Sequence, residues 1–276
     1  MTNKDYQLIA PTLPHHPGIY QFKNAPRFLD RYSSLSALST QNTEKVKQLQ
    51  LEALDDDFWL IVYQAINSSK VTDLNIAKLR ELLYHPHSQV RVGSANKLKS
   101  AKDDALTPIL LEAFSKNNEQ SYSVISARLS ALQELDSKAA LKVAQQLQYE
   151  TYPRIVTSIA EIFADTKDTK HLDFFYKNAV DIDGFYASKF FSLYTELLLK
   201  ADKDTIEKHT MLLSNIAQED DYNWKRYHAA KVIKAGSDTL GNRDGFDTLV
   251  QQLDRYIAII KASEKSTRIQ NLYRGW

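Results

Sequence analysis

The chain contains a cassette that recurs about every 31 to 35 residues, and each copy reads as two amphipathic helices separated by a short break. An apolar residue follows each equivalent position by eight places, which keeps it on the same helical face. A fixed period of this length with two helices per copy predicts an α-solenoid of HEAT-like or ARM-like helical hairpins. The positions that we take as equivalent are separated by 32, 34, 31, 35 and 34 residues, and they are Phe58, Val90, Val124, Ile155, Phe190 and Trp224.

Residues that interrupt helices are scarce, which favours an all-α fold. Glycine and proline occur only seven times each in 276 residues. We expect about seven helical pairs over residues 24–276, opening at Asn24 to Pro26, because Asn caps helices well and Pro is tolerated in a first turn. A loop over residues 235–245 should precede a closing helix over about 246–262. The tail from Ser263 reads as a continued or frayed last helix.

The first 23 residues differ from the rest of the chain. Pro11, Pro14 and Pro17 are spaced by three, and proline disfavours helix at the preceding residue, so this stretch is predicted to be extended or irregular. Residues 18–23 alternate weakly, as a short strand would. A lone strand needs a ladder partner, so residues 1–23 are predicted to be a linker or an orphaned strand.

The composition excludes several classes of function. The 35 basic and 34 acidic residues give a formal charge of +1, whereas strong nucleic-acid binders carry a basic excess. Cysteine is absent, which excludes disulfides and thiolate chemistry. No apolar run approaches the roughly 18–20 residues that span a bilayer. We therefore expect no nucleic-acid partner and no membrane segment in this chain.

The sequence lacks the motifs of the common hydrolases. No histidine is followed by glutamate and no two histidines are three or four residues apart, so the zinc-hydrolase helix is missing. No serine lies in a Gly-x-Ser-x-Gly elbow. The acidic run Asp55 to Asp57 favours a helix first turn over a calcium loop. We predict no catalytic, cofactor-binding or metal-binding residue in this chain.

One basic and aromatic cluster is a candidate binding site on the concave face: Lys225, Arg226 and Tyr227. The chain has 15 tyrosines, and aromatic rings stack on bases in some proteins that bind single strands. Tyrosine also fills the gaps between helix pairs while its hydroxyl reaches solvent. A nucleic-acid function would require Lys225 and Arg226 to converge on one groove with Arg128 and Arg154.

The stretch from Tyr20 to Tyr32 reads YQFKNAPRFLDRY and resembles a junction in bacterial zinc aminopeptidases of the aminopeptidase N (membrane alanyl aminopeptidase) family. There a β-sandwich domain leads into a C-terminal helical-repeat domain. Residues 51–61 resemble the repeat openings that follow it, and residues 87–92 are similar to a general HEAT opening. The resemblance covers about the first 100 residues in recognisable motif.

The resemblance implies a non-catalytic C-terminal domain whose concave wall of second helices closes the active-site chamber and limits which peptide substrates enter. The family's zinc motif and its Gly-Ala-Met-Glu-Asn loop are absent, so zinc is implied only for a missing catalytic domain. Catalytic and β-sandwich domains upstream in the same polypeptide would be the partners, and Met1 would begin a fragment. The residues expected nearest those domains are Tyr20, Phe22, Pro26, Phe28 and Arg31.

Two other interpretations remain open. One is a free-standing HEAT-like scaffold that binds proteins on its concave face, which the balanced charge and large helical surface favour. The other is a helical-repeat nucleic-acid-binding protein, such as the alkylated-DNA glycosylases that are built on HEAT-like repeats. Whether the chain belongs to an enzyme is open under these interpretations.

Overall fold

The computed structural model describes residues 27–39, 43–70, 73–116 and 119–276. Within these residues it contains 15 α-helices and no β-strand, so the prediction of an all-α fold is confirmed. The helices alternate as the first and second members of seven pairs, and one more helix follows the last pair. The predictions for residues 1–23 and for the helix opening at 24–26 lie outside the described residues.

The chain folds as two compact units, residues 1–139 (unit 1) and 140–276 (unit 2). Helix α10 (Ser137–Gln146) begins at the end of unit 1 and lies mostly in unit 2. The other elements of unit 1 are α3 (Phe28–Leu38), α4 (Glu44–Ala53), α5 (Trp59–Ser68), α6 (Asp73–Leu82), α7 (Ser88–Lys99), the short 3₁₀ helix η2 (Asp104–Leu106), α8 (Thr107–Lys116) and α9 (Tyr122–Leu135).

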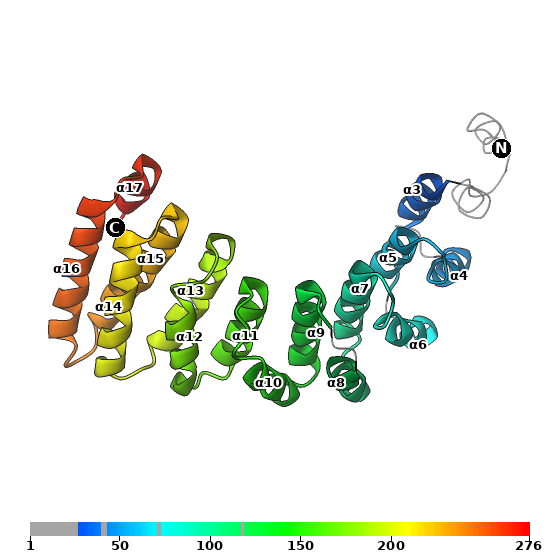
Figure 1. Ribbon diagram of the computed structural model, residues 1–276, viewed down its shortest axis with the longest axis horizontal. Helices are drawn as coiled ribbons and strands as arrows, with labels where there is room; N and C mark the ends of the chain where they lie inside the picture. The colour runs from blue at the N-terminus through cyan, green and yellow to red at the C-terminus, as the bar shows by residue number, and fades with distance from the viewer. Residues whose placement is uncertain (1–26, 40–42, 71–72, 117–118) are drawn as a thin grey trace. The chain divides into compact units, whose positions relative to one another are not determined.

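First helices make the close contacts between the repeats of unit 1. Helix α3 packs on α5, α5 on α7 and α7 on α9, and these four follow one another as a row in Figure 1. Each second helix packs against a first helix, α4 on α5, α6 on α7 and α8 on α9. Fully buried apolar side chains such as Leu35, Ile61, Val90 and Val124 fill these contacts. This is the nearest-neighbour stacking of an α-solenoid.

Unit 2 repeats the same arrangement with longer helices. Its first helices pack in the order α11, α13, α15 and α17, and α14 packs on both α15 and α16. Helices α13 to α16 have 15 to 18 residues, whereas those of unit 1 have 10 to 14. After α10, the elements of unit 2 are α11 (Pro153–Asp165), η3 (Thr169–His171), α12 (Leu172–Asn178), α13 (Gly184–Leu198), α14 (Lys203–Glu219), α15 (Asn223–Leu240), α16 (Asp247–Ser263) and α17 (Thr267–Tyr273).

Polar residues begin several helices, mostly where the sequence predicts. Asp136 begins α10 by accepting a hydrogen bond from the backbone N–H of Ala139 at 2.9 Å. Pro153 occupies the first position of α11, where a missing N–H costs nothing. We expected Ser88 to cap α7, but the cap is His87, whose Nδ1 accepts from the backbone of the second helical residue.

Aligned on the residue that caps each first helix, the repeats are less regular than the apolar pattern indicates. The positions that we took as equivalent do not align: Val90, Val124 and Ile155 lie three places after their caps, whereas Phe58 is itself a cap and Phe190 lies seven places after one. Successive caps are separated by 31, 29, 34, 31, 31, 39 and 44 residues, and they are Arg27, Phe58, His87, Ser121, Tyr152, Asp183, Tyr222 and Ser266.

The C-terminal region differs in detail from the prediction. Helix α15 extends through the first part of the predicted loop to Leu240. The closing helix α16 spans Asp247–Ser263, close to the expected range. The chain leaves that helix at Glu264, whose backbone is extended, and begins a separate helix, α17. Helix α17 contacts α15, so the tail occupies the place of another first helix and does not continue α16.

Candidate functional site

Four exposed aromatic side chains lie at or just before the beginnings of three first helices of unit 2. Tyr149 and Tyr152 precede α11, Phe185 lies in the first turn of α13, and Tyr222 caps α15. Their exposed fractions are 82%, 42%, 83% and 47%. Aromatic residues are enriched at protein interfaces relative to the rest of the surface. We call these four residues the aromatic edge.

The aromatic edge is held in place by a close backbone approach. The Tyr222 ring lies on Gly184, the first residue of α13, so that a Cβ atom added to Gly184 would lie 2.0 Å from the Cδ1 atom of Tyr222. Only glycine leaves room for the ring there. The ring is thereby placed between the beginnings of α13 and α15.

Acidic side chains surround the aromatic edge. Glu150, Asp183 and Asp221 are exposed within two residues of one of its members, and the exposed Asp181 lies four residues before Phe185. Arg154 is the exposed basic residue beside Tyr152. The local balance is therefore acidic although the whole chain is nearly neutral, so complementary charge on a partner would be basic.

A small pocket opens beside Asp181, between the beginning of α11 and the loop that precedes α13. Its volume is about 30 Å³, room for roughly two water molecules. Val156 provides its apolar wall, and Asp181 provides a carboxylate. The residues that line it are Thr151, Pro153, Val156, Asn178, Asp181 and Ile182.

An arginine links neighbouring repeats elsewhere in the chain. In unit 1, Arg91 Nε and Nη2 donate to the two carboxylate oxygens of Glu119, both at 2.8 Å. Its Nη1 donates to the backbone oxygens of His85 at 2.7 Å and Pro86 at 2.8 Å. Glu119 also accepts from the backbone N–H of Ser121 at 2.9 Å. Burial raises the pKa of Glu119, but these hydrogen bonds and the Arg91 charge outweigh burial and hold it below its ordinary value.

The same arrangement recurs in unit 2 with different residues. Arg226 Nε and Nη2 donate to the Glu264 carboxylate at 3.1 and 2.6 Å. Its Nη1 donates to the backbone oxygens of Asp220 and Asp221, at 2.7 and 3.3 Å. Glu264 also accepts from the backbone N–H of Ser266 at 2.7 Å. In both cases the arginine lies four residues after a helix cap, and the carboxylate lies two residues before the next cap.

The predicted cluster Lys225, Arg226 and Tyr227 is brought together on α15, but its charged groups are bonded within unit 2. Lys225 is buried, and its ammonium donates to the backbone oxygen of Val180 and pairs with Asp220 at 2.7 Å. Arg226 makes the link to Glu264. The sequence suggests an exposed basic patch here, but both cationic head groups bind residues of other repeats or of the loop before α15. A binding role for these three residues stays a prediction.

Tyr227 belongs to an aromatic cluster between α15 and α17. Its ring stacks with those of Tyr273 and Trp276, both at 5.9 Å between centroids. Arg268 lies 4.8 Å above the ring of Trp224 in the same region. These contacts attach α17 to α15, so we assign Tyr227 to the packing of the last helix.

Two of the five residues expected at an interdomain contact are described. Phe28 is partly exposed and its ring lies 4.3 Å from that of Phe58, between centroids. Arg31 donates from Nε and Nη2 to Asp56, both at 3.1 Å, which is another arginine link between repeats. Tyr20, Phe22 and Pro26 lie outside the described residues.

The four basic residues required for a nucleic-acid groove are mostly committed to the fold. Arg128 is fully buried in unit 1 and donates to the backbone oxygens of Ala113 and Leu83 at 2.6 and 2.7 Å. In unit 2, Lys225 and Arg226 are engaged as described above, whereas Arg154 is exposed. Three of these four charges therefore have internal partners, and the expectation of no nucleic-acid partner stays a prediction.

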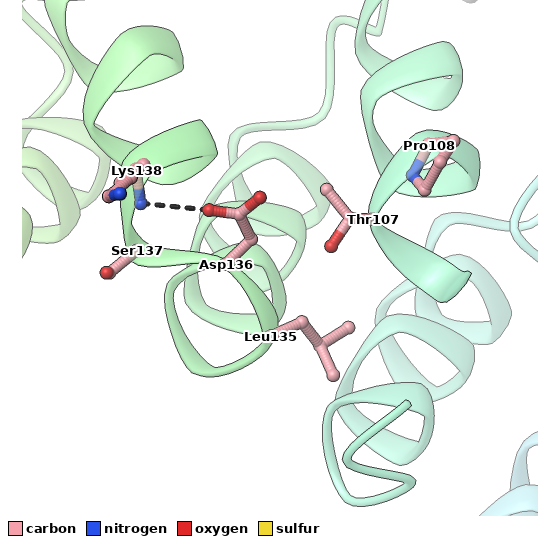
Figure 2. Close-up of a pocket in the computed structure, with 6 residues that line it drawn as sticks. All are labelled: Thr107, Pro108, Leu135, Asp136, Ser137 and Lys138. Atoms are coloured by element: carbon pink, nitrogen blue, oxygen red, sulfur yellow. Dashed lines mark hydrogen bonds between the residues drawn. The ribbon is translucent and has the colours of Figure 1, made fainter. Parts of the chain in front are cut away.

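A larger and more open groove lies in unit 1, between the beginnings of α8 and α10 (Figure 2). Its volume is about 550 Å³. Thr107 and Pro108 lie on one side and Leu135 and Asp136 on the other. Asp136 already accepts from the backbone N–H groups at the start of α10, as the dashed line to Lys138 shows in part. The groove therefore offers helix-capping groups and little chemistry for a specific ligand.

Within the described ranges, no group of three or more His, Asp or Glu side chains is arranged to hold a metal ion. A search of the same ranges finds no helix both long and apolar enough to cross a bilayer.

The fold defines a helical-repeat protein built from HEAT-like hairpins. No family model and no curated protein matches the chain. Among solved structures, a chain in the complex of CpcE and CpcF of phycocyanin lyase from Nostoc sp. PCC7120 is similar, with 14% identity and a TM-score of 0.47. The match covers 91% of this chain and 96% of the other.

These findings contradict the resemblance to the aminopeptidase N family. Neither the family models nor the curated proteins support that family, and the similar solved structure reported above is a phycocyanin lyase complex of CpcE and CpcF. The expected role in an aminopeptidase, and upstream catalytic and β-sandwich domains as partners, are corrected accordingly. The junction motif was short, and its last five residues lie in the first described helix, α3. The zinc that it implied rested on the same resemblance and is carried no further.

Proposed function

We propose that the chain is a helical-repeat protein-interaction module, and that the aromatic edge of unit 2 binds a basic segment of another protein. The observation that carries this proposal is the exposure of four aromatic side chains at the beginnings of three successive first helices. Stacked repeats present extended surfaces that suit the binding of other chains. The acidic residues around the edge favour a partner that carries lysine or arginine.

The aromatic edge suits a cationic partner in a second way. Aromatic faces attract ammonium and guanidinium groups, and arginine also stacks on them. Tyr149 and Phe185 present most of their side chains to solvent, close to Glu150 and Asp183. A basic segment would gain both ring contacts and charge pairing here, whereas an acidic segment or a phosphate backbone would meet repulsion.

The test is a selection with a random peptide library displayed on phage, using the purified full chain as the target. We expect selected peptides to be enriched in arginine and lysine. A synthetic copy should bind the double variant Tyr149→Ser/Phe185→Ser at least tenfold more weakly by fluorescence anisotropy. The matched control is Met211→Ser/Ile259→Ser, which removes two half-exposed apolar side chains from the second helices α14 and α16.

Two results would overturn the proposal. One is equal binding of the selected peptides to the edge variant and the wild-type chain. The other is retardation of DNA or RNA in a gel at low salt that the edge variant abolishes, because electrostatic binding is strongest there. The control variant should bind as the wild-type chain does, and circular dichroism should show all three proteins folded.

A further inference from the structure

The pocket beside Asp181 lies where an arginine would lie if this repeat were built like the α7 and α15 repeats. In the α7 and α15 repeats, the residue four places after the cap is Arg91 or Arg226, and its guanidinium joins the carboxylate two places before the next cap. In the α11 repeat the cap is Tyr152, so the corresponding residue is Val156. The corresponding carboxylate is that of Asp181, two places before the cap Asp183.

The α11 repeat also has the backbone oxygens that bind the guanidinium in the α7 and α15 repeats. Arg91 and Arg226 donate to the backbone oxygens two and one places before their own cap. The same positions in the α11 repeat are Glu150 and Thr151, and Thr151 lines the pocket. An aspartate suits the carboxylate position, because Asp56 accepts both nitrogens of Arg31 in the first repeat. Val156 is too short to reach Asp181, so the space is left as a cavity.

The next repeat shows that an arginine on the preceding helix is not required. Helix α13 has Ala187 four places after its cap, and there Lys225 enters from the following helix. Its ammonium pairs with Asp220 and donates to the backbone oxygen of Val180, so it takes the place that an arginine has in the other links. In the described part of unit 2, Asp181 makes no hydrogen bond or ion pair, and no side chain supplies it with a cation.

We propose that the pocket formed by Val156, Thr151 and Asp181 is an arginine-binding site, which takes the guanidinium of an arginine from the partner segment. This deepens the proposed function and rests on it for the identity of the partner. The incoming guanidinium bonds to the Asp181 carboxylate and to backbone oxygens of the loop before α11. The apolar stem of the arginine would lie against Pro153, Val156 and Ile182, which line the pocket.

The first test uses ethylguanidinium chloride as the probe and the full chain labelled with ¹⁵N. We expect saturable amide shifts at Thr151, Asn178 and Asp181, with a dissociation constant on the order of millimolar. Ethylammonium at the same ionic strength should give smaller shifts, because a lysine-like head lacks the planar fork. The shifts should be lost in Asp181→Asn and kept in Asp221→Asn, an exposed acid on the same edge. Equal shifts with both salts, or shifts that survive Asp181→Asn, would overturn the inference.

The second test fills the site from within. Val156→Arg places an arginine where Arg91 and Arg226 lie in their repeats, so it should pair with Asp181, raise the melting temperature and abolish the ethylguanidinium shifts. Val156→Leu fills the apolar wall without a cation and is the matched control. A folded Val156→Arg chain that still binds ethylguanidinium like the wild type would sink the proposal. If the protein fails to fold, Asp181→Asn still decides the question.

The two proposals fail in different ways. Guanidinium binding at Asp181 without any peptide selected for the aromatic edge would leave the arginine site standing and remove the proposed function. Selected basic peptides whose binding is insensitive to Asp181→Asn would keep the aromatic edge and remove the arginine site. If both stand, replacing one arginine of a selected peptide by lysine should weaken its binding at least tenfold to the wild-type chain and little to Asp181→Asn.

Discussion

Arg91 and Glu119 are 28 residues apart in sequence, yet both carboxylate oxygens of Glu119 accept a hydrogen bond from the Arg91 guanidinium. Both side chains are largely buried. The pair joins α7 to the loop before α9, and those two helices form the most extensive packing within unit 1. A charge pair with two parallel hydrogen bonds and additional backbone partners is worth more than an exposed ion pair.

Replacing Arg91 by alanine should therefore destabilise the protein by about 2–4 kcal/mol, because Glu119 loses its best partner while it stays buried. Arg91→Lys should recover less than half of that loss, since an ammonium cannot form the two parallel bonds. The measurement is urea unfolding followed by circular dichroism. Arg255→Ala, at an exposed arginine of α16, is the control and should change the free energy of unfolding by less than about 0.5 kcal/mol.

Arg128 provides a second stability prediction, in the same part of unit 1. Its buried guanidinium donates to two backbone oxygens and lies 3.7 Å from Glu119. Arg128→Met keeps much of the volume but leaves those oxygens without a donor, so we expect a loss of about 3–5 kcal/mol in urea unfolding. A loss below about 1 kcal/mol would show that water replaces the guanidinium.

The buried pair Tyr194 and His209 predicts a dependence of stability on pH. The Tyr194 hydroxyl lies 2.6 Å from His209 Nδ1, and both side chains are buried. Burial, reinforced by the nearby Lys208 charge, lowers the pKa of His209 to about 4, and the Asp173 carboxylate opposes this shift only weakly. Burial also raises the pKa of the Tyr194 hydroxyl, so it remains protonated and can donate to the neutral imidazole.

Between pH 6.5 and 4 the unfolded chain therefore binds a proton at His209 that the folded chain does not. The stability from this group is complete above pH 6.5 and is lost as the pH falls through 4. In urea unfolding, the wild-type protein should lose about 2 kcal/mol more than His209→Gln between pH 7 and pH 4.5. Parallel losses in the two proteins would show that His209 is already charged in the fold.

Gly184 and Tyr222 should be energetically coupled. Alanine at the first position of a helix is normally favourable, but here its Cβ atom would overlap the Tyr222 ring. We expect Gly184→Ala to destabilise the protein by about 1–3 kcal/mol by forcing that ring out of place. In Gly184→Ala/Tyr222→Ala the clash is absent, so a double-mutant cycle in urea unfolding should give a coupling of at least about 1 kcal/mol. Additive losses would contradict the packing described for this edge.

The all-α fold and the closing helix α16 could be predicted because they depend on local patterns. Apolar spacing and scarce glycine and proline identify helices without any knowledge of their neighbours. The start of α13 could not be placed this way. It begins at Gly184, but its first turn carries the exposed Phe185, so the apolar pattern only becomes regular near Phe190.

The candidate site could not be predicted for a different reason. Arginine links join residues 25, 28 and 38 positions apart, and no fixed spacing reveals them. They become visible only when the repeats are aligned on their helix caps. The same alignment indicates that Lys225 and Arg226 form internal ion pairs, because Asp220 and Glu264 each lie two places before a helix cap. A search for carboxylates two places before each cap is the signal that the sequence contains.

The links between repeats also limit how such a chain can gain or lose a repeat during evolution. Each link is encoded in two halves by adjacent repeats, an arginine in one and a carboxylate in the next. Deleting residues 56–84 would place His85 opposite Arg31, so two cationic or neutral donors would meet where Arg31 now meets Asp56. A duplication that begins and ends at a helix cap would instead copy both the arginine of one link and the carboxylate of another. A rearrangement cut at another point would therefore separate the two halves of the links made by Arg31, Arg91 and Arg226.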